Sequence, residues 1–198
     1  MSLGILLLTA AIAQNVILVH FLGPWPYPVV LASLRRSVYF SLGITAAIVW
    51  VSLSYSLVFR FVLEPLALEF LSTFLMVAIL GVSFLVSTRA ARYLYPFSGR
   101  AITRAMPVVF FNTGVFVVPM ALAETVETFW HIPLVALAAG VGLLVALVPV
   151  AALYEHLSVA RLPRVLRGNV LILLATALFA LALHQLDVML ATLAYPLW

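Results

Sequence analysis

The stretch "PVVFFNTGVFVVP", residues 107–119, interrupts an apolar segment near its middle. Asn112 and Thr113 place polar side chains there, and Gly114 weakens a continuous helix. Pro119 follows within two turns. Inside lipid, non-helical backbone is tolerated only where protein or a water-filled cavity covers it. The stretch therefore predicts a transmembrane helix that is broken into two half-helices.

A second interruption, "HFLGPWPYP" at residues 20–28, ends the first apolar segment, and three prolines follow Gly23 within five positions. Paired breaks in corresponding segments of two halves are typical of inverted-repeat membrane proteins. Two simpler readings stay open at this point. Residues 23–28 could form only the first loop, and Asn112 could be a hydrogen-bonded polar residue between helices.

The composition identifies an integral membrane protein. Of 198 residues, 66% are hydrophobic and 8% are charged, and the mean hydropathy is +1.26. Soluble domains carry about 25% charged residues, so this chain cannot cover a water-facing surface. It contains no cysteine, which excludes disulfides, thiolate–metal sites and cysteine nucleophiles. The N-terminus shows no signal-peptide pattern.

Six segments are long and apolar enough to cross a bilayer, which takes about 20 residues. We expect one all-α membrane domain, residues 1–198, arranged as a 3+3 inverted repeat (about 1–95 and 96–198) with helices one and four broken. Polar residues at 184, 185 and 187 interrupt the sixth segment, which could instead end near Leu183. The segments are Leu3–Leu22, Ser37–Phe59, Leu66–Thr88, Met106–Leu122, Ile132–Leu153, and Val170 to about Leu193.

The arginines predict the orientation. All ten basic residues are arginine, and nine follow the odd-numbered segments, whereas Arg60 follows the second. Basic loops stay in the cytoplasm, so both termini should lie on the outer, periplasmic side of a bacterial inner membrane. The net charge of +4 is thus a topology signal, and we expect no nucleic acid partner. The nine are Arg35, Arg36, Arg89, Arg92, Arg100, Arg104, Arg161, Arg164 and Arg167.

Three stretches carry a resemblance to a known family: "NVILVHFLGPWPY" (15–27), "MPVVFFNTG" (106–114) and "AALYEHLSVARLPRVLRGN" (151–169). The chain resembles the RnfA/NqrE family, six-helix membrane subunits of the ion-translocating ferredoxin:NAD oxidoreductase (Rnf) and the sodium-pumping NADH:quinone oxidoreductase (Nqr). The third stretch is the most specific. Its residues in register with the family are Glu155, Leu157, Pro163, Arg167, Gly168 and Asn169.

The resemblance implies half-helices, an inverted repeat and a homologous partner of opposite orientation, of the RnfE/NqrD type. The two proteins would share a 2Fe–2S cluster near the membrane midplane, and each would contribute one cysteine from each of its two breaks. Electrons would pass through that cluster, and their passage would be linked to cation translocation.

Here the two cysteine positions fall on Trp25 and Thr113. Iron–sulfur clusters are held by cysteine thiolates, sometimes with histidine. Indole cannot ligate iron, and a neutral hydroxyl is a poor ligand. We therefore expect no family-type cluster or other metal in this chain, which leaves iron–sulfur, flavin or quinone cofactors to partner subunits.

Other polar residues near the breaks have competing interpretations. His20 could be a ligand or proton carrier, or a hydrogen-bonded histidine that reaches the interface. Asn15 and Asn112 are expected to satisfy backbone groups that the breaks set free, rather than to bind an ion. Glu155 could pair with Arg167 across the fifth loop, or remain solvated.

The favoured function is a membrane scaffold in a multisubunit electron-transport complex. Such a scaffold would join its partner through segments one and four, contact membrane lipids, and have no catalytic residue of its own. One alternative is a small-solute or ion transporter or channel. A further alternative is an accessory or assembly protein of another membrane complex.

Overall fold

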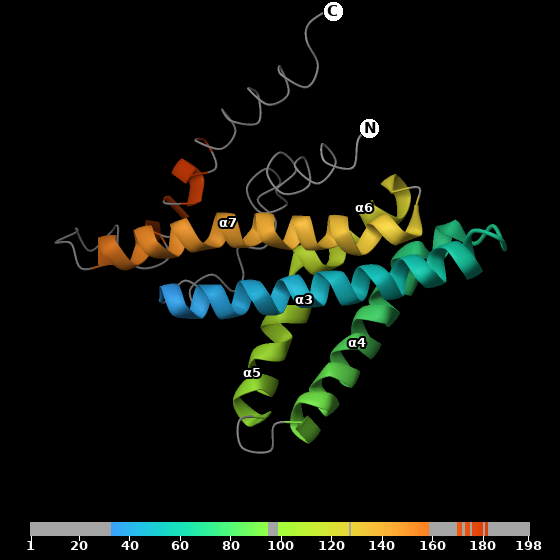
Figure 1. Ribbon diagram of the computed structural model, residues 1–198, viewed down its shortest axis with the longest axis horizontal. Coiled ribbons are helices and arrows are strands. Elements are labelled where there is room, and N and C mark those ends of the chain that lie inside the picture. Colours follow the sequence, from blue (N-terminus) through green and yellow to red (C-terminus); the bar gives the residue numbers. More distant parts are fainter. Residues whose placement is uncertain are drawn as a thin grey trace, which may run out of the picture. The chain divides into compact units, whose positions relative to one another are not determined.

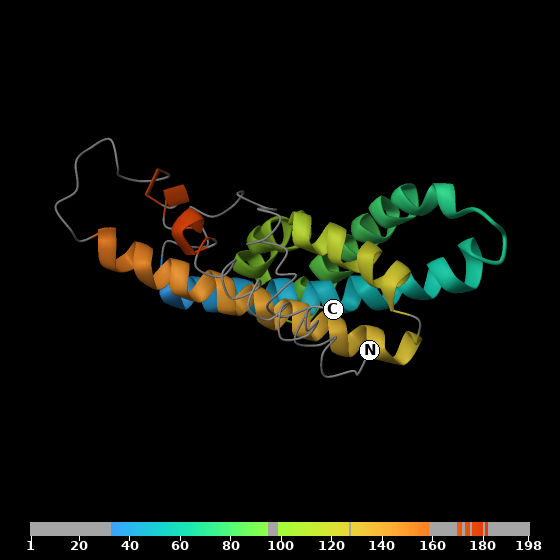
Figure 2. The ribbon, with the colours of Figure 1, turned by 90° about the horizontal axis from the view of Figure 1, so that it is seen from above.

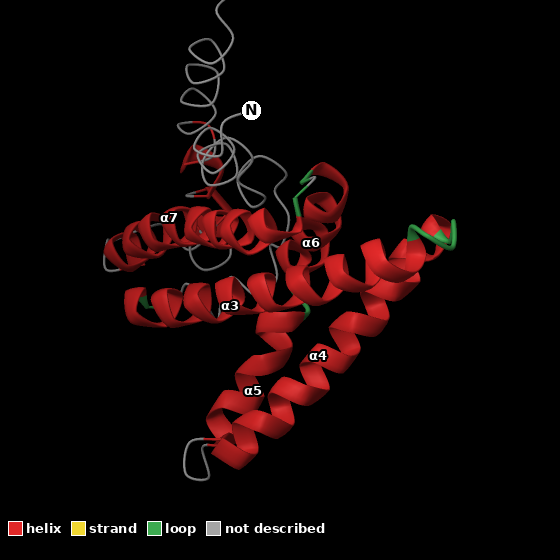
Figure 3. Ribbon diagram, turned by 45° about the vertical axis from the view of Figure 1, so that its right-hand side comes forward, coloured by secondary structure: helices red, strands yellow, loops and turns green. Residues whose placement is uncertain are grey.

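The computed structural model describes residues 33–94, 99–126 and 128–158, together with residues 170–171, 173–174, 176–179 and 181. Every regular element in these ranges is a helix (Figure 3), so the all-α prediction is confirmed for them. The predicted first segment, the break at 20–28 and most of the sixth segment lie outside these residues. The elements are α3 (Leu34–Val58), the π-helix η2 (Phe59–Leu63), the 3₁₀-helix η3 (Glu69–Leu71), α4 (Ser72–Leu94), α5 (Gly99–Phe110), α6 (Thr113–Thr125), the 3₁₀-helix η4 (Phe129–His131) and α7 (Ile132–Ser158).

Four of the six predicted membrane segments have counterparts in the described residues. Three are helices long and apolar enough to cross a membrane, namely Leu34–Leu63, Glu69–Leu94 and Phe129–His156. The fourth is a bent pair, Ile102–Phe110 followed by Thr113–Thr125, with 51° between its two parts. The break predicted from residues 112–114 is therefore present, whereas the six-helix inverted repeat stays a prediction.

The helices run further than predicted, and this corrects the loop assignment of several arginines. We expected the second and third segments to end just before Arg60 and Arg89. Instead, Arg60 lies within η2, and α4 continues through Arg89 and Arg92 to Leu94. Arginine has a long apolar stem, so its charged head reaches water from a helix that is still in the membrane interface. Positive charge near a helix C-terminus is also favourable.

A wide turn and a tight turn link α3 to α4. The amide of Glu64 donates to the carbonyl of Phe59 at 2.9 Å, which spans five residues instead of the usual four. Pro65 then occupies the second position of a turn that the Ala67 amide closes on the Glu64 carbonyl at 3.2 Å. Ala67 has a positive φ of 53°. Together these turns reverse the chain into η3 and α4 (Figure 1).

The chain divides into two compact units, which we describe separately. The first comprises Met1–Leu42 and Ala138–Trp198, and the second comprises Gly43–Leu137. Helices α3 and α7 run through the boundaries. In the second unit α4 lies along α5 and also contacts α6 (Figures 1 and 2). Its most deeply buried side chains include Ile44, Ile48, Val51, Tyr55, Met76, Val115 and Ile132.

Candidate functional site at the helix break

The break between α5 and α6 is a short, fully hydrogen-bonded connection. The Phe111 amide donates to the Pro107 carbonyl at 2.9 Å and completes the last turn of α5. Asn112 then adopts an extended conformation (φ −90°, ψ 137°), and its side-chain oxygen accepts from the Gly114 amide at 2.8 Å. The Val115 amide donates to the Asn112 carbonyl at 3.0 Å. Asn112 is thus the N-cap of α6.

Gly114 allows this cap to close. A Cβ at Gly114 would lie 3.2 Å from Oδ1 of Asn112, tighter than an ordinary contact. Both residues are buried. Within the membrane, an amide freed by the break must find a partner inside the protein, and Asn112 supplies it. Thr113, the first residue of α6, is only partly buried.

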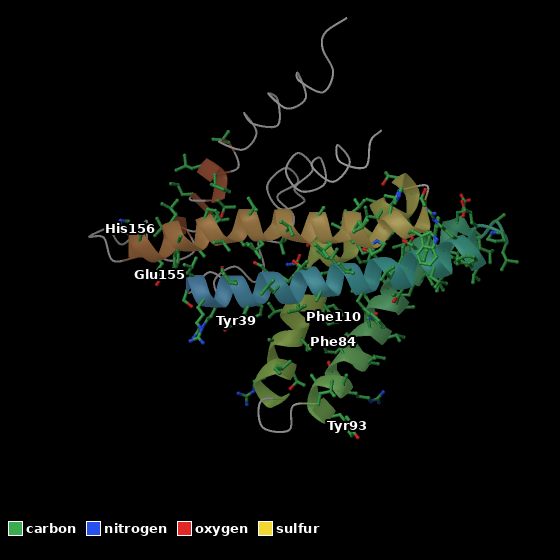
Figure 4. All side chains as sticks on the ribbon, in the orientation of Figure 1. Tyr39, Phe84, Tyr93, Phe110, Glu155 and His156 are labelled. Carbon is green, nitrogen blue, oxygen red and sulfur yellow. The ribbon has the colours of Figure 1, made fainter. Side chains whose placement is uncertain are left out.

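Two neighbouring helices cover the end of α5. The ring of Phe84 in α4 lies edge-on to Phe110, with centroids 6.2 Å apart, and 5.3 Å from the ring of Phe111 (Figure 4). Gly43 in α3 faces Val109, because a Cβ at Gly43 would lie 3.5 Å from Cγ2 of Val109. The break is therefore packed against α3 and α4 within the second unit.

The far end of α6 is held by Arg60. Its guanidinium donates to the backbone carbonyl of Val126, the C-cap of α6, and the Val126 amide donates to Leu122 at 3.0 Å. A cation at a helix C-terminus complements the helix dipole. Sequence reasoning used Arg60 only as an orientation marker and missed this contact, which joins residues 66 positions apart.

In the first unit, Glu155 of α7 meets the start of α3. Its Oε2 accepts from the Leu34 amide at 3.1 Å (Figure 4), a favourable place for a carboxylate at a helix N-terminus. One turn on, the guanidinium of Arg35 lies 5.8 Å from the ring centroid of Tyr39. The expected partner Arg167 lies outside the described residues. No local pattern identifies Leu34 as the contact, since it is 121 positions away.

The remaining predicted site residues are divided between the two breaks. Asn15, His20 and Trp25 lie outside the described residues, whereas Asn112 and Thr113 stand together at the start of α6. Within the described ranges, no three His, Cys, Asp or Glu side chains are grouped to hold a metal ion. A 2Fe–2S cluster requires thiolates, and the chain has no cysteine. The donor set at Thr113 does not fit such a cluster.

Comparison with known proteins places this geometry in a family context. A family model described as "Rnf-Nqr subunit, membrane protein" matches residues 4–190. The A subunit of the ion-translocating oxidoreductase complex of Ectopseudomonas mendocina is 28% identical over 182 residues, covering 91% of this chain and 94% of that protein. The protein of the same name from Escherichia fergusonii is 27% identical over 178 residues, covering 90% and 92%.

Proposed function

Since the chain belongs to the Rnf-Nqr family of membrane subunits, we propose that it is a scaffold subunit of an ion-translocating oxidoreductase complex. Its relatives carry the name of one subunit of such a complex. In this role it would position other redox-active subunits within the membrane, with no catalytic residue and no iron–sulfur cluster of its own.

The observation that carries this proposal is the capped break at Asn112 and Thr113. The half-helix geometry is retained, with 51° between its two parts. The position where the resemblance places a cluster cysteine holds a threonine, whose neutral hydroxyl does not replace a thiolate. The cap at Asn112 satisfies the freed amide of Gly114 without any metal. A scaffold needs the bend, and this bend is maintained by hydrogen bonds.

The finer architecture belongs to the same proposal. The chain would form six helices in two inverted halves, with both termini on the outer side of a bacterial inner membrane. A homologous RnfE/NqrD-like subunit of opposite orientation would contact its first and fourth segments. Iron–sulfur, flavin or quinone carriers would then reside in partner subunits. The positive-inside distribution of arginines supports this orientation.

The transporter and assembly-protein alternatives are less favoured. The relatives align over nearly their whole length and are named as subunits of a redox complex. No observation on the described residues points specifically to a solute site at the break, since its polar groups are used in capping α6.

Purification from native membranes tests the proposal. A tagged chain, extracted in mild detergent, should bring with it a second multispanning membrane protein and flavin- or iron-containing subunits, identified by mass spectrometry. After separation from these partners, the chain should contain no iron. A chain that purifies without redox subunits would contradict the scaffold role, and iron retained by the isolated chain would contradict the absence of a cluster.

A gain-of-function variant sharpens the cluster test. Trp25→Cys combined with Thr113→Cys returns thiols to both family positions, and should raise the iron content of the complex and give a 2Fe–2S absorbance. The matched control is Thr125→Cys, which adds a thiol at the other end of α6. Equal iron in both variants would show that positions 25 and 113 have no special relation to a cluster.

A further inference from the structure

Two serine hydroxyls near the end of α3 are fully buried and unsatisfied. Ser52 and Ser56 are each 0% exposed, and neither Oγ has a hydrogen-bond partner within the part of the chain that the structure describes. Four residues apart, they lie on the same face of the helix. Buried polar groups in proteins are nearly always paired with protein or with ordered water, so an exception requires an explanation.

Other hydroxyls on these helices follow a different pattern. Ser54 donates to the Trp50 carbonyl at 2.9 Å. Thr88 and Thr125 likewise donate to the carbonyls four residues before them, each at 2.7 Å. This back-bonding is the usual way for a helical hydroxyl to be satisfied in apolar surroundings. Ser52 and Ser56 do not use it, so their hydroxyls remain available to a ligand.

The polar surroundings continue toward the end of α3. Tyr55, buried on the same face, has its hydroxyl hydrogen-bonded to Ser72 at the start of α4, and it interacts electrostatically with Glu124 near the end of α6. Arg60 donates to the Val126 carbonyl at the same end of α6. Charged and hydroxyl groups from three helices thus gather where α3 ends.

The hydroxyls reach from this end far into the span. At 1.5 Å per residue, Ser52 lies about 12 Å along the helix axis from Arg60. It is only about 5 Å from the midpoint of the apolar helix Leu34–Leu63. At that depth in a membrane protein no lipid group can satisfy a hydroxyl.

We propose that Ser52, Tyr55 and Ser56 bind internal water and form a hydrated row that leads from Glu124 toward the middle of the membrane. Water suits this site because it both donates to and accepts from hydroxyls, and because a buried water needs two to four polar partners. The described residues offer no grouped acidic or histidine side chains that would favour a metal ion instead. The hydrated row goes beyond the scaffold function, since it gives the interior of the second unit access to water.

Cysteine accessibility tests the hydrated row directly. The chain has no cysteine, so Ser52→Cys and Ser56→Cys each carry a single thiol that resembles the serine in size. The control Val51→Cys is equally buried and at nearly the same depth, but at an apolar position. A thiol reacts as its thiolate, which forms in water and is suppressed in apolar surroundings.

The full chain in detergent is treated with a small water-soluble methanethiosulfonate, and its modification is followed by intact mass. We expect both serine positions to react at least about tenfold faster than Val51→Cys. Rates equal to that of the control would overturn the proposal. Neither result depends on other subunits, so failure of this test and failure of the scaffold function are distinguishable.

A second measurement covers the case in which a cysteine variant does not fold. Removing a hydroxyl that holds water loses a hydrogen bond, so Ser52→Ala and Ser56→Ala should lower the Tm of the detergent-solubilised chain. Removing a hydroxyl that has no ligand relieves a buried unsatisfied group and should raise the Tm. A rise in both variants would overturn the proposal. The reference is Ser54→Ala, whose hydroxyl is bonded to Trp50.

Discussion

Asn112 shows how one side chain can maintain a helix start inside a membrane. Its carboxamide oxygen takes the amide of Gly114, and its own carbonyl takes the amide of Val115. Water would otherwise satisfy such groups, but none is available in the hydrocarbon core. The side chain is buried, so the hydrogen bond is shielded from competition.

We predict that Asn112→Ala lowers the free energy of unfolding by about 1–2 kcal/mol, because it removes the cap and leaves the Gly114 amide buried without a partner. Denaturant or thermal unfolding of the detergent-solubilised chain measures the change. Asn112→Ser is the control, since its hydroxyl can accept the same bond and should restore most of the loss. Equal stability of the alanine variant and the natural chain would refute the capping role.

Single residues also show where sequence reasoning stops. The role of Asn112 could be predicted, because capping is local and a polar residue before an apolar run indicates it. The partners of Glu155 and Arg60 could not, because both contacts join residues far apart in the sequence. Those contacts depend on how helices dock, which no residue pattern specifies.

At the scale of helices, the bend between α5 and α6 combines a local cause with a tertiary one. The polar residues at 112–114 predicted the break, but neither its 51° angle nor its surroundings. The Phe84 ring from α4 contacts both Phe110 and Phe111, the last residue of α5 and the one after it. These ring contacts hold the last turn of α5 against α4.

We expect Phe84→Leu to destabilise the chain by about 1 kcal/mol, since it retains most of the apolar bulk but loses two ring contacts. Hydrogen exchange should show faster exchange at the amides of 111 and 114, next to the break. The matched control is Phe74→Leu in the same helix, whose ring is 74% exposed. Similar effects of the two substitutions would indicate that the rings do not support the break.

The helix ends were the least predictable feature at this scale. Arg60, Arg89 and Arg92 look like loop residues in a hydropathy profile, yet each lies within a helix. Hydropathy marks where the hydrocarbon core ends, whereas the helix ends where its backbone finds other partners. The two limits differ by up to two turns here.

For the whole molecule, the distribution of arginines makes a prediction about topology. A C-terminal fusion to alkaline phosphatase should be active and one to green fluorescent protein dark, because nine of ten arginines assign the odd-numbered connections to the cytoplasm. Fusions made after Leu94 should behave in the opposite way. A fluorescent C-terminal fusion would reverse the proposed orientation.

The class of protein and the presence of apolar spans followed from composition, because a chain with 8% charged residues has few arrangements open to it. Which helices become neighbours did not follow. The contacts of α4 with α5 and α6 come from side-chain complementarity between helices that are all apolar. In such a chain hydropathy distinguishes lipid from water, but it does not distinguish one helix surface from another.

The wide turn η2 has a consequence for chain length. Each residue of an α-helix advances the rotation by about 100°, and η2 winds one residue more into its turn than an α-helix does. Deleting one residue between Phe61 and Leu63 would leave the apolar character unchanged, yet would turn everything after it by roughly a quarter of a circle. A homologue one residue shorter here must enter its next helix from another direction. The spacing of this segment therefore works as an angular setting that no hydropathy plot records.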